Sequence, residues 1–190
     1  MKRSIISVAV LSAVFMSAGA FAAGEEGTLT IEGTIINSSC HFEDNKNSSV
    51  ITLPEIDASR FSGLSAGAVV GTEVANATPM KIICPAGTKL NTIRISNGEF
   101  TTDGVLKNTK EVNGDMDASK GVGVKLKLGT KLITNDEETN IRDILTATKD
   151  DPSGVEYSLD FSAQYARLNE ATPVVAGEIS SVLTISVSAE

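Results

Sequence analysis

Apolar and polar residues alternate over most of this chain, and very little of it has the spacing of a helix. The most regular stretch runs from Val122 to Leu128, where apolar residues hold every second position and Lys125 and Lys127 fall between them. A period of two is typical of a β-strand with one buried and one solvated face. Gly, Asn, Asp, Ser and Pro separate such stretches at short intervals, so the pattern predicts an all-β protein.

The other alternating stretches predict further strands. They cover residues 27–36, 50–54, 80–85, 92–96, 157–165 and 178–188. Residues 60–72 indicate a long loop or weak edge strand, 134–138 a polar loop and 150–154 a turn, as does Asn97-Gly98. Helical spacing is limited to a short turn within 141–147. Without an internal repeat or linker, these elements predict one domain, a β-sandwich of immunoglobulin-like type.

The first of these strands has an unusual place in the chain. Leu29, Ile31 and Ile35 form its apolar row, and Gly33 takes the one empty position in that row. Chain ends are usually loose unless something holds them. A well-formed strand with a free end can pair within its own domain or with the sheet of another chain.

The N-terminal residues have the pattern of a secretory signal. Lys2 and Arg3 precede an apolar core over residues 5–18, and Ala20-Phe21-Ala22 has the small-residue spacing of a cleavage site. A transmembrane anchor is the alternative, but this core is short for a span. We expect residues 1–22 to be removed, so that the mature protein lies on the far side of a membrane.

The charge of the chain excludes one class of partner. With the loss of Lys2 and Arg3, 16 basic residues become 14 against 24 acidic ones, which gives a net charge of −10. Such a chain, without a basic run, is poorly suited to bind nucleic acid or an anionic membrane. We therefore expect no nucleic-acid partner, and the acidic residues indicate a solvated surface.

Two cysteines, Cys40 and Cys84, occur in this exported chain. In an oxidising compartment one intramolecular disulfide is the simplest prediction, with free thiols or bonds between chains as the alternatives. Two cysteines and His41 offer too few ligands for a metal site at these spacings. We expect no metal and no cofactor.

No catalytic constellation is visible in the sequence. The single histidine, His41, has no nucleophile motif around it, and neither HExxH nor a phosphate-binding GKS/T loop occurs. Asp115-x-Asp117-x-Ser119 has part of a calcium-loop pattern, but Lys120 stands where the sharp turn needs glycine. The sequence predicts no enzyme and no catalytic residue.

Several stretches resemble one family when they are taken in order along the chain. They are Gly27-Thr28-Leu29-Thr30-Ile31-Glu32-Gly33, Ile35-Ile36-Asn37-Ser38-Ser39-Cys40, Ile51-Thr52-Leu53-Pro54, Ile82-x-Cys84, Phe161-x-Ala163-x-Tyr165, Ala171-Thr172-Pro173, and Gly177 with the strand that follows it. In this order they resemble the shaft pilins of type 1-like fimbriae, which are assembled by a chaperone and an usher. One departure is Ala189, where this family usually carries an aromatic residue.

The resemblance implies a fold and a mechanism of assembly. Such pilins are incomplete immunoglobulin-like sandwiches that lack their last strand, and a donor strand from another chain completes them. Residues 23–36 would be the N-terminal donor extension and 37–190 the pilin domain. The donor row would be Leu29, Ile31, Gly33 and Ile35, and the groove edge Gly177, Ile179, Leu183, Ile185 and Val187.

The resemblance also implies partners and a location. A periplasmic chaperone fills the groove first, an outer-membrane usher exports the subunit, and neighbouring copies then form a homopolymer on the cell surface that supports adhesion. Two alternatives remain open. Instead of a shaft subunit, the chain would be a minor adaptor of the same pilus, or a self-contained secreted β-sandwich that binds a ligand. The self-contained protein would pair residues 27–36 inside its own domain.

Overall fold

A computed structural model describes residues 27–35, 40–134, 138–142, 144–152 and 154–189. Within these residues the strands are β1 (Gly27–Ile35), β2 (His41–Phe42), β3 (Ser48–Leu53), β4 (Val69–Ala75), β5 (Met80–Cys84), β6 (Leu90–Ser96), β7 (Leu106–Lys107), β8 (Val122–Leu128), β9 (Lys131–Ile133), β10 (Glu138–Asn140), β11 (Ala147–Asp151), β12 (Gly154–Leu159), β13 (Phe161–Arg167) and β14 (Ile179–Ala189). One α-helix, α1 (Thr109–Val112), and two 3-10 turns, η1 (Glu43–Asn45) and η2 (Ala58–Phe61), complete the described elements. The predicted signal, residues 1–22, lies outside them.

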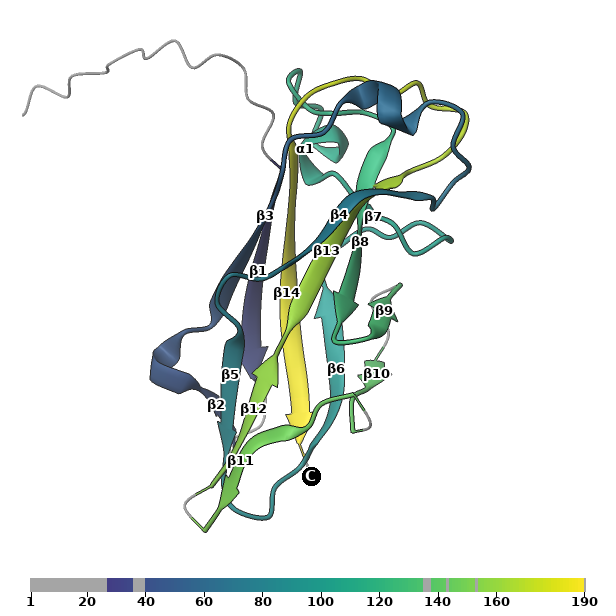
Figure 1. The fold of residues 1–190 in the computed structure, drawn as a ribbon. Coiled ribbons are helices and arrows are strands. Elements are labelled where there is room, and N and C mark those ends of the chain that lie inside the picture. Colours follow the sequence, from purple (N-terminus) through teal and green to yellow (C-terminus); the bar gives the residue numbers. More distant parts are fainter. Residues whose placement is uncertain (1–26, 36–39, 135–137, 143, 153, 190) are drawn as a thin grey trace, which may run out of the picture.

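The strands form three sheets. The first has the order β10-β6-β14-β1-β3, the second β11-β12-β5-β2 and the third β4-β13-β8-β7, with β9 beside β8. β12 and β13 follow each other directly through Asp160, so the second and third sheets run on end to end along the molecule (Figure 1). The expected all-β, immunoglobulin-like sandwich is confirmed.

Alternation along the strands produces the core. In β8, Val122, Val124, Leu126 and Leu128 are buried, while Lys125 and Lys127 are half-buried between them. Residues from all three sheets belong to one continuous apolar cluster. The period-two pattern therefore indicated correctly which face of each main strand is buried.

Cys40 and Cys84 form the disulfide, and both lie in this core. The intramolecular bond, the simplest of the three readings of the cysteines, is therefore confirmed. It joins the residue before β2 to the end of β5. A loop closed over a separation of 44 residues stabilises the fold by about 4 kcal/mol in the chain-entropy model.

The single strand predicted over 157–165 is two strands. β12 pairs with β5, and β13 pairs with β4 and β8, so the chain changes sheets at Asp160. The apolar row continues across this point because Leu159 and Phe161 are both buried. An unbroken alternation therefore hides a change of hydrogen-bonding partners.

The polar edge strands were predicted less precisely than the core strands. The predicted loop or weak edge over 60–72 contains the start of β4, an edge strand, and the turn over 150–154 is shorter because Asp150 and Asp151 belong to β11. Glu138 belongs to β10 rather than to a loop. These strands are held by backbone hydrogen bonds with few buried side chains, so their sequences carry little alternation.

Candidate functional site

β1 lies inside the first sheet, between β14 and β3 (Figure 1). It runs parallel to β14 over its whole length, from Gly27 to Ile35. On its other edge it runs antiparallel to β3 from Gly27 to Glu32. The stretch predicted to be a strand is therefore a strand, and its two edges are both hydrogen-bonded.

The two strands that flank β1 present buried rows toward the core. On β14 the buried residues are Ile179, Ser181, Leu183, Ile185 and Val187, and on β3 they are Ser49, Ile51 and Leu53. Ser181 and Ser49 are the small members of these rows. The predicted groove-edge residues of β14 thus lie in one row along the strand that receives β1.

The register places the predicted donor positions against these rows. Leu29 is aligned with Ser181 of β14, and Ile31 is aligned with Ser49 of β3. Leu29 and Ile31 therefore each have a small residue beside them on one flanking strand, whereas Ile35 is aligned with Val187. Gly33 and Ile35 continue the same row, and Gly27 begins it. Gly27 was missed as a member, although the period of two extends back to it.

This pairing takes place within one chain. The self-contained β-sandwich hypothesis expected residues 27–36 to pair inside their own domain, and β1 does so in this structure. The connection from Ile35 to Cys40 is only a few residues long, so the direction of β1 follows from its attachment. A donor strand from another copy has no such attachment, so it could run in either direction.

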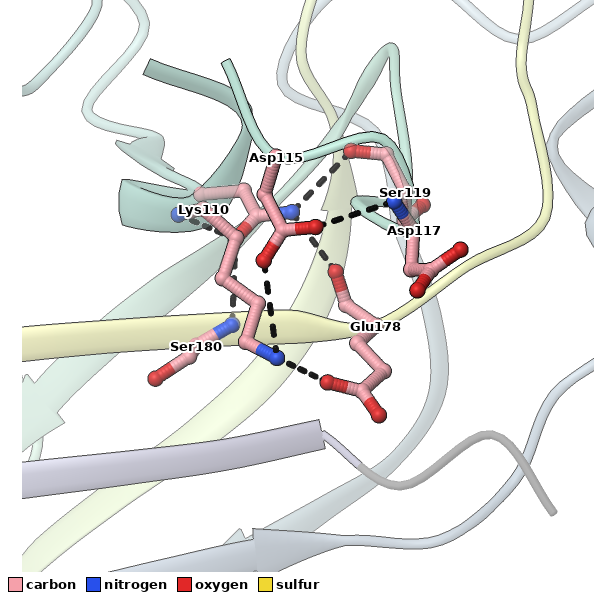
Figure 2. Close-up of polar contacts among 7 residues, drawn as sticks. Lys110, Asp115, Asp117, Ser119, Glu178 and Ser180 are labelled. Atoms are coloured by element: carbon pink, nitrogen blue, oxygen red, sulfur yellow. Dashed lines mark hydrogen bonds and ion pairs between the residues drawn. The ribbon is translucent and has the colours of Figure 1, made fainter. Parts of the chain in front are cut away.

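A polar group that the sequence analysis missed lies at the start of β14. Asn108 is fully buried, and its Nδ2 donates to the carbonyl oxygens of Ser119 at 3.0 Å and Glu178 at 2.8 Å. Its Oδ1 accepts from the backbone N–H groups of Lys110 at 3.1 Å and Ser180 at 3.0 Å. We call Asn108 and Lys110, with Glu178 and Ser180, the β14 anchor. Figure 2 labels Lys110, Glu178 and Ser180.

The charged part of the β14 anchor is exposed. The Lys110 ammonium donates to the Glu178 carboxylate, and this bond raises the pKa of Lys110. Asp115 lies 4.0 Å from the same ammonium and accepts a hydrogen bond from the backbone N–H of Asp117 (Figure 2). The Asp115 side chain therefore stabilises the turn from Asp115 to Asp117. Among the described residues, no group of three His, Cys, Asp or Glu is arranged to hold a metal.

Gly177 lies just before β14, against the loop that carries the β14 anchor. A Cβ atom at Gly177 would be 2.4 Å from the carbonyl oxygen of Asp117 and 2.7 Å from the backbone of Ala118 and Ser119. Only glycine permits this approach. A small apolar cavity adjoins the same end of β14, and its lining includes Ile56, Phe61, Val122, Tyr165, Val174 and Ile179.

A family model described as "Fimbrial protein" matches residues 29–190. The chain belongs to the fimbrial protein family. The uncharacterized fimbrial-like protein YehD of Escherichia coli (strain K12) is 36% identical over 195 residues, which cover 99% of each of the two chains. The resemblance inferred from the quoted stretches is thereby confirmed for the family.

Membership of the family settles several of the expectations. This fimbrial protein is an exported subunit of a cell-surface fimbrium, and it assembles with other subunits. No helix in the described part of the chain is long and apolar enough to cross a membrane. The family consists of structural proteins, which gives no support to a catalytic role.

One sequence signal pointed to the β14 anchor of this fimbrial protein. Asn108 precedes Thr109, Lys110 and Glu111, which is the pattern of a helix N-cap followed by polar helix formers. In the structure Asn108 does cap α1, because its Oδ1 accepts from Lys110 N–H. The second use of the side chain, on β14, involves residues 70 positions away and is not visible in the sequence.

Proposed function

We propose that this chain is a structural pilus subunit that polymerises by donor-strand exchange and catalyses no reaction. In this proposal residues 23–36 of one copy enter the slot between β3 and β14 of the next. The observation that carries the proposal is the position of β1, at the start of the described chain and between two strands of a sheet. Such a strand can leave without interrupting any other part of the fold.

The slot cannot remain empty. β3 has no strand partner other than β1 among the described residues, and β14 would keep β6 along only its second half. Without β1, the buried rows of β3 and β14 and two unpaired edges would face water. An exposed apolar row beside an open edge is prone to aggregate, so another strand must cover it.

The energy of filling the slot is large enough to hold a polymer together. Leu29, Ile31 and Ile35 would each contribute about 1.5–3 kcal/mol on full burial, in addition to backbone hydrogen bonds. Gly33 would fit where the slot is shallow. The same row supplies this energy whether it comes from the chain itself or from a neighbour.

Competition between these two sources explains why a chaperone would be needed. The chain's own β1 is attached to the slot, and a short tether gives an effective concentration of about a millimolar or more. A free neighbour cannot compete at lower concentrations. A periplasmic chaperone that occupies the slot would prevent self-pairing until the usher brings the next donor strand.

The test is export of the chain, with and without residues 23–34, together with a periplasmic chaperone and an outer-membrane usher, followed by electrophoresis of the assemblies without full denaturation. We expect a ladder of polymers from the complete chain and none from the shortened one. Ile31→Asn should remove the ladder, whereas Thr30→Asn, the matched change at the neighbouring half-buried position, should keep it. Equally stable monomers from both lengths of chain would contradict the proposal.

The same experiment separates the alternatives. A shaft subunit forms long ladders of itself, whereas a minor adaptor would give none without its other subunits. The self-pairing of β1 is the observation that favours a self-contained secreted sandwich. That protein would stay monomeric, and removal of residues 23–34 would only destabilise it.

A further inference from the structure

The two halves of β14 are supported differently on the side that faces away from β1. Residues from Thr184 to Ala189 pair with β6. β6 ends at Ser96, because Asn97, with φ of +62°, and Gly98 turn the chain away. Among the described residues, no strand pairs with that side of the first half, Ile179 to Leu183.

The segment from Lys107 to Ser119 takes the place of a strand beside this first half. The Ser181 hydroxyl, on a residue that is 1% exposed, donates to the carbonyl oxygen of Lys107 at 2.9 Å. Glu178 N–H donates to the carbonyl of Asp117 at 2.8 Å, and Ser119 N–H donates to the carbonyl of Glu178 at 2.9 Å. Lys107 belongs to β7, so the Ser181 bond ties β14 to the third sheet, and the other two bonds hold the residue before β14 to the segment.

Asn108 is the residue of this segment with the most bonds to β14. It uses both donors and both acceptor positions of its amide, two of them on the backbone of Glu178 and Ser180. Since Asn108 is buried, each of these bonds would be costly to lose. The side chain therefore fixes the position of β14 along its own axis, not only its distance from the third sheet.

We propose that Asn108 is a positioning residue for strand exchange, which holds the first half of β14 in register while one donor strand leaves and another enters. The inference rests on the proposed function. With β1 gone, Ile179 to Leu183 have no strand on either side and depend on the β14 anchor and the Ser181 bond. A slip of one residue would turn the buried row outward and close the slot to a donor.

Hydrogen exchange on the complete chain tests the anchoring. In Asn108→Ala, we expect the backbone amides from Ser180 to Leu183 to exchange about tenfold faster, because a buried hydrogen-bonded group is lost there. The amides of Ile185 and Val187, which β6 supports, should change less than about twofold. A uniform acceleration along β14, or none, would overturn the inference.

Two further variants make the test specific. Ser188→Ala removes the hydroxyl that lies 2.7 Å from Thr92 at the other end of β14, and it should leave the first half unchanged. If Asn108→Ala does not fold, Ser181→Ala replaces it, with an expected acceleration of about threefold confined to the first half. An unchanged first half in Ser181→Ala would then count against the proposal.

A labelled synthetic peptide of residues 27–36, supplied above the effective concentration of about a millimolar of the chain's own β1, tests the link to exchange. At a temperature where denaturant titration shows every variant fully folded, Asn108→Ala should capture the peptide about fivefold more slowly and Ser188→Ala at the unchanged rate. Equal rates of capture by the unmodified chain and by Asn108→Ala would contradict the role of Asn108 but not the proposed strand exchange. No capture by the unmodified chain would contradict strand exchange itself, and with it this role.

Discussion

β1 and β8 have the same alternating pattern but very different positions in the fold. β8 lies in the middle of the chain and pairs antiparallel with β13 on one side and with β7 and β9 on the other. β1 begins at Gly27 and is parallel to one neighbour, β14, although parallel pairs are slightly less stable per residue. The alternation of each stretch predicted a strand, and both are strands.

The difference between them lies in what would follow if each strand were removed. Loss of β8 would cut the chain and divide the third sheet, whereas detachment of β1 leaves every other described strand connected in sequence. One alternating stretch, β8, therefore belongs to what we call the permanent core, the strands β2 to β14, and the other, β1, is the strand that we propose is exchanged. The following changes test this contrast, from the largest expected effect to the smallest.

Replacement of both Cys40 and Cys84 by Ala should have the largest effect. The disulfide ties the base of the β1 arm to β5, and its loss should lower the free energy of unfolding by about 4 kcal/mol. Urea titration of the oxidised and the double-Ala chains measures this difference. A loss below about 1 kcal/mol would show that the bond does not hold the arm to the permanent core.

Leu126→Ala compared with Ile31→Ala tests the contrast directly. Leu126 is fully buried in β8, so its truncation should cost about 2–5 kcal/mol in monomer and polymer alike. In the monomer, Ile31→Ala can lower the free energy of unfolding by no more than the free energy of detaching β1. Its main effect should be a less stable polymer. Denaturant titration of both forms separates these results. Equal losses for both variants in the monomer would make β1 part of the permanent core.

Gly33→Leu should act on assembly with little effect on the disulfide-bonded fold. A large side chain in the empty place of the donor row would clash where the slot is shallow, which blocks polymerisation. Thr30→Leu is the matched control, because Thr30 lies between two positions of the donor row. Native electrophoresis should show polymers for the control only. Normal polymers from Gly33→Leu would contradict the fit of the row to the slot.

Acid should have the smallest effect, through a contact that joins β4 to β8 and β13 in the third sheet. Glu73 of β4 accepts hydrogen bonds from Lys127 of β8 and Ser162 of β13, and these bonds lower the pKa of Glu73 below its ordinary 4.5. Its contribution is therefore complete above pH 4.5 and is lost as the pH falls through the lowered value. Stability measured from pH 6 to pH 3 should fall less in Glu73→Gln. An identical dependence of stability on pH in the two chains would show that Glu73 makes no such contribution.

Much of the candidate site could be predicted because it depends on local pattern. The apolar row of β1, the buried row of β14 and the cysteines were all identified from spacing and residue type. The β14 anchor was not predicted, because Asn108 acts on Glu178 and Ser180 across the sandwich. Nothing in the residues next to Asn108 distinguishes this role from helix capping.

The sequence by itself determined the strand class, the buried face of each main strand and the family resemblance, since side chains alternate with a period of two in any strand. Only the tertiary structure decided which strands are partners. Backbone hydrogen-bonding groups are the same at every residue, so the alternation in β1 could not specify β14 and β3 as its neighbours. It also could not show that the first half of β14 is supported by Asn108 instead of a strand.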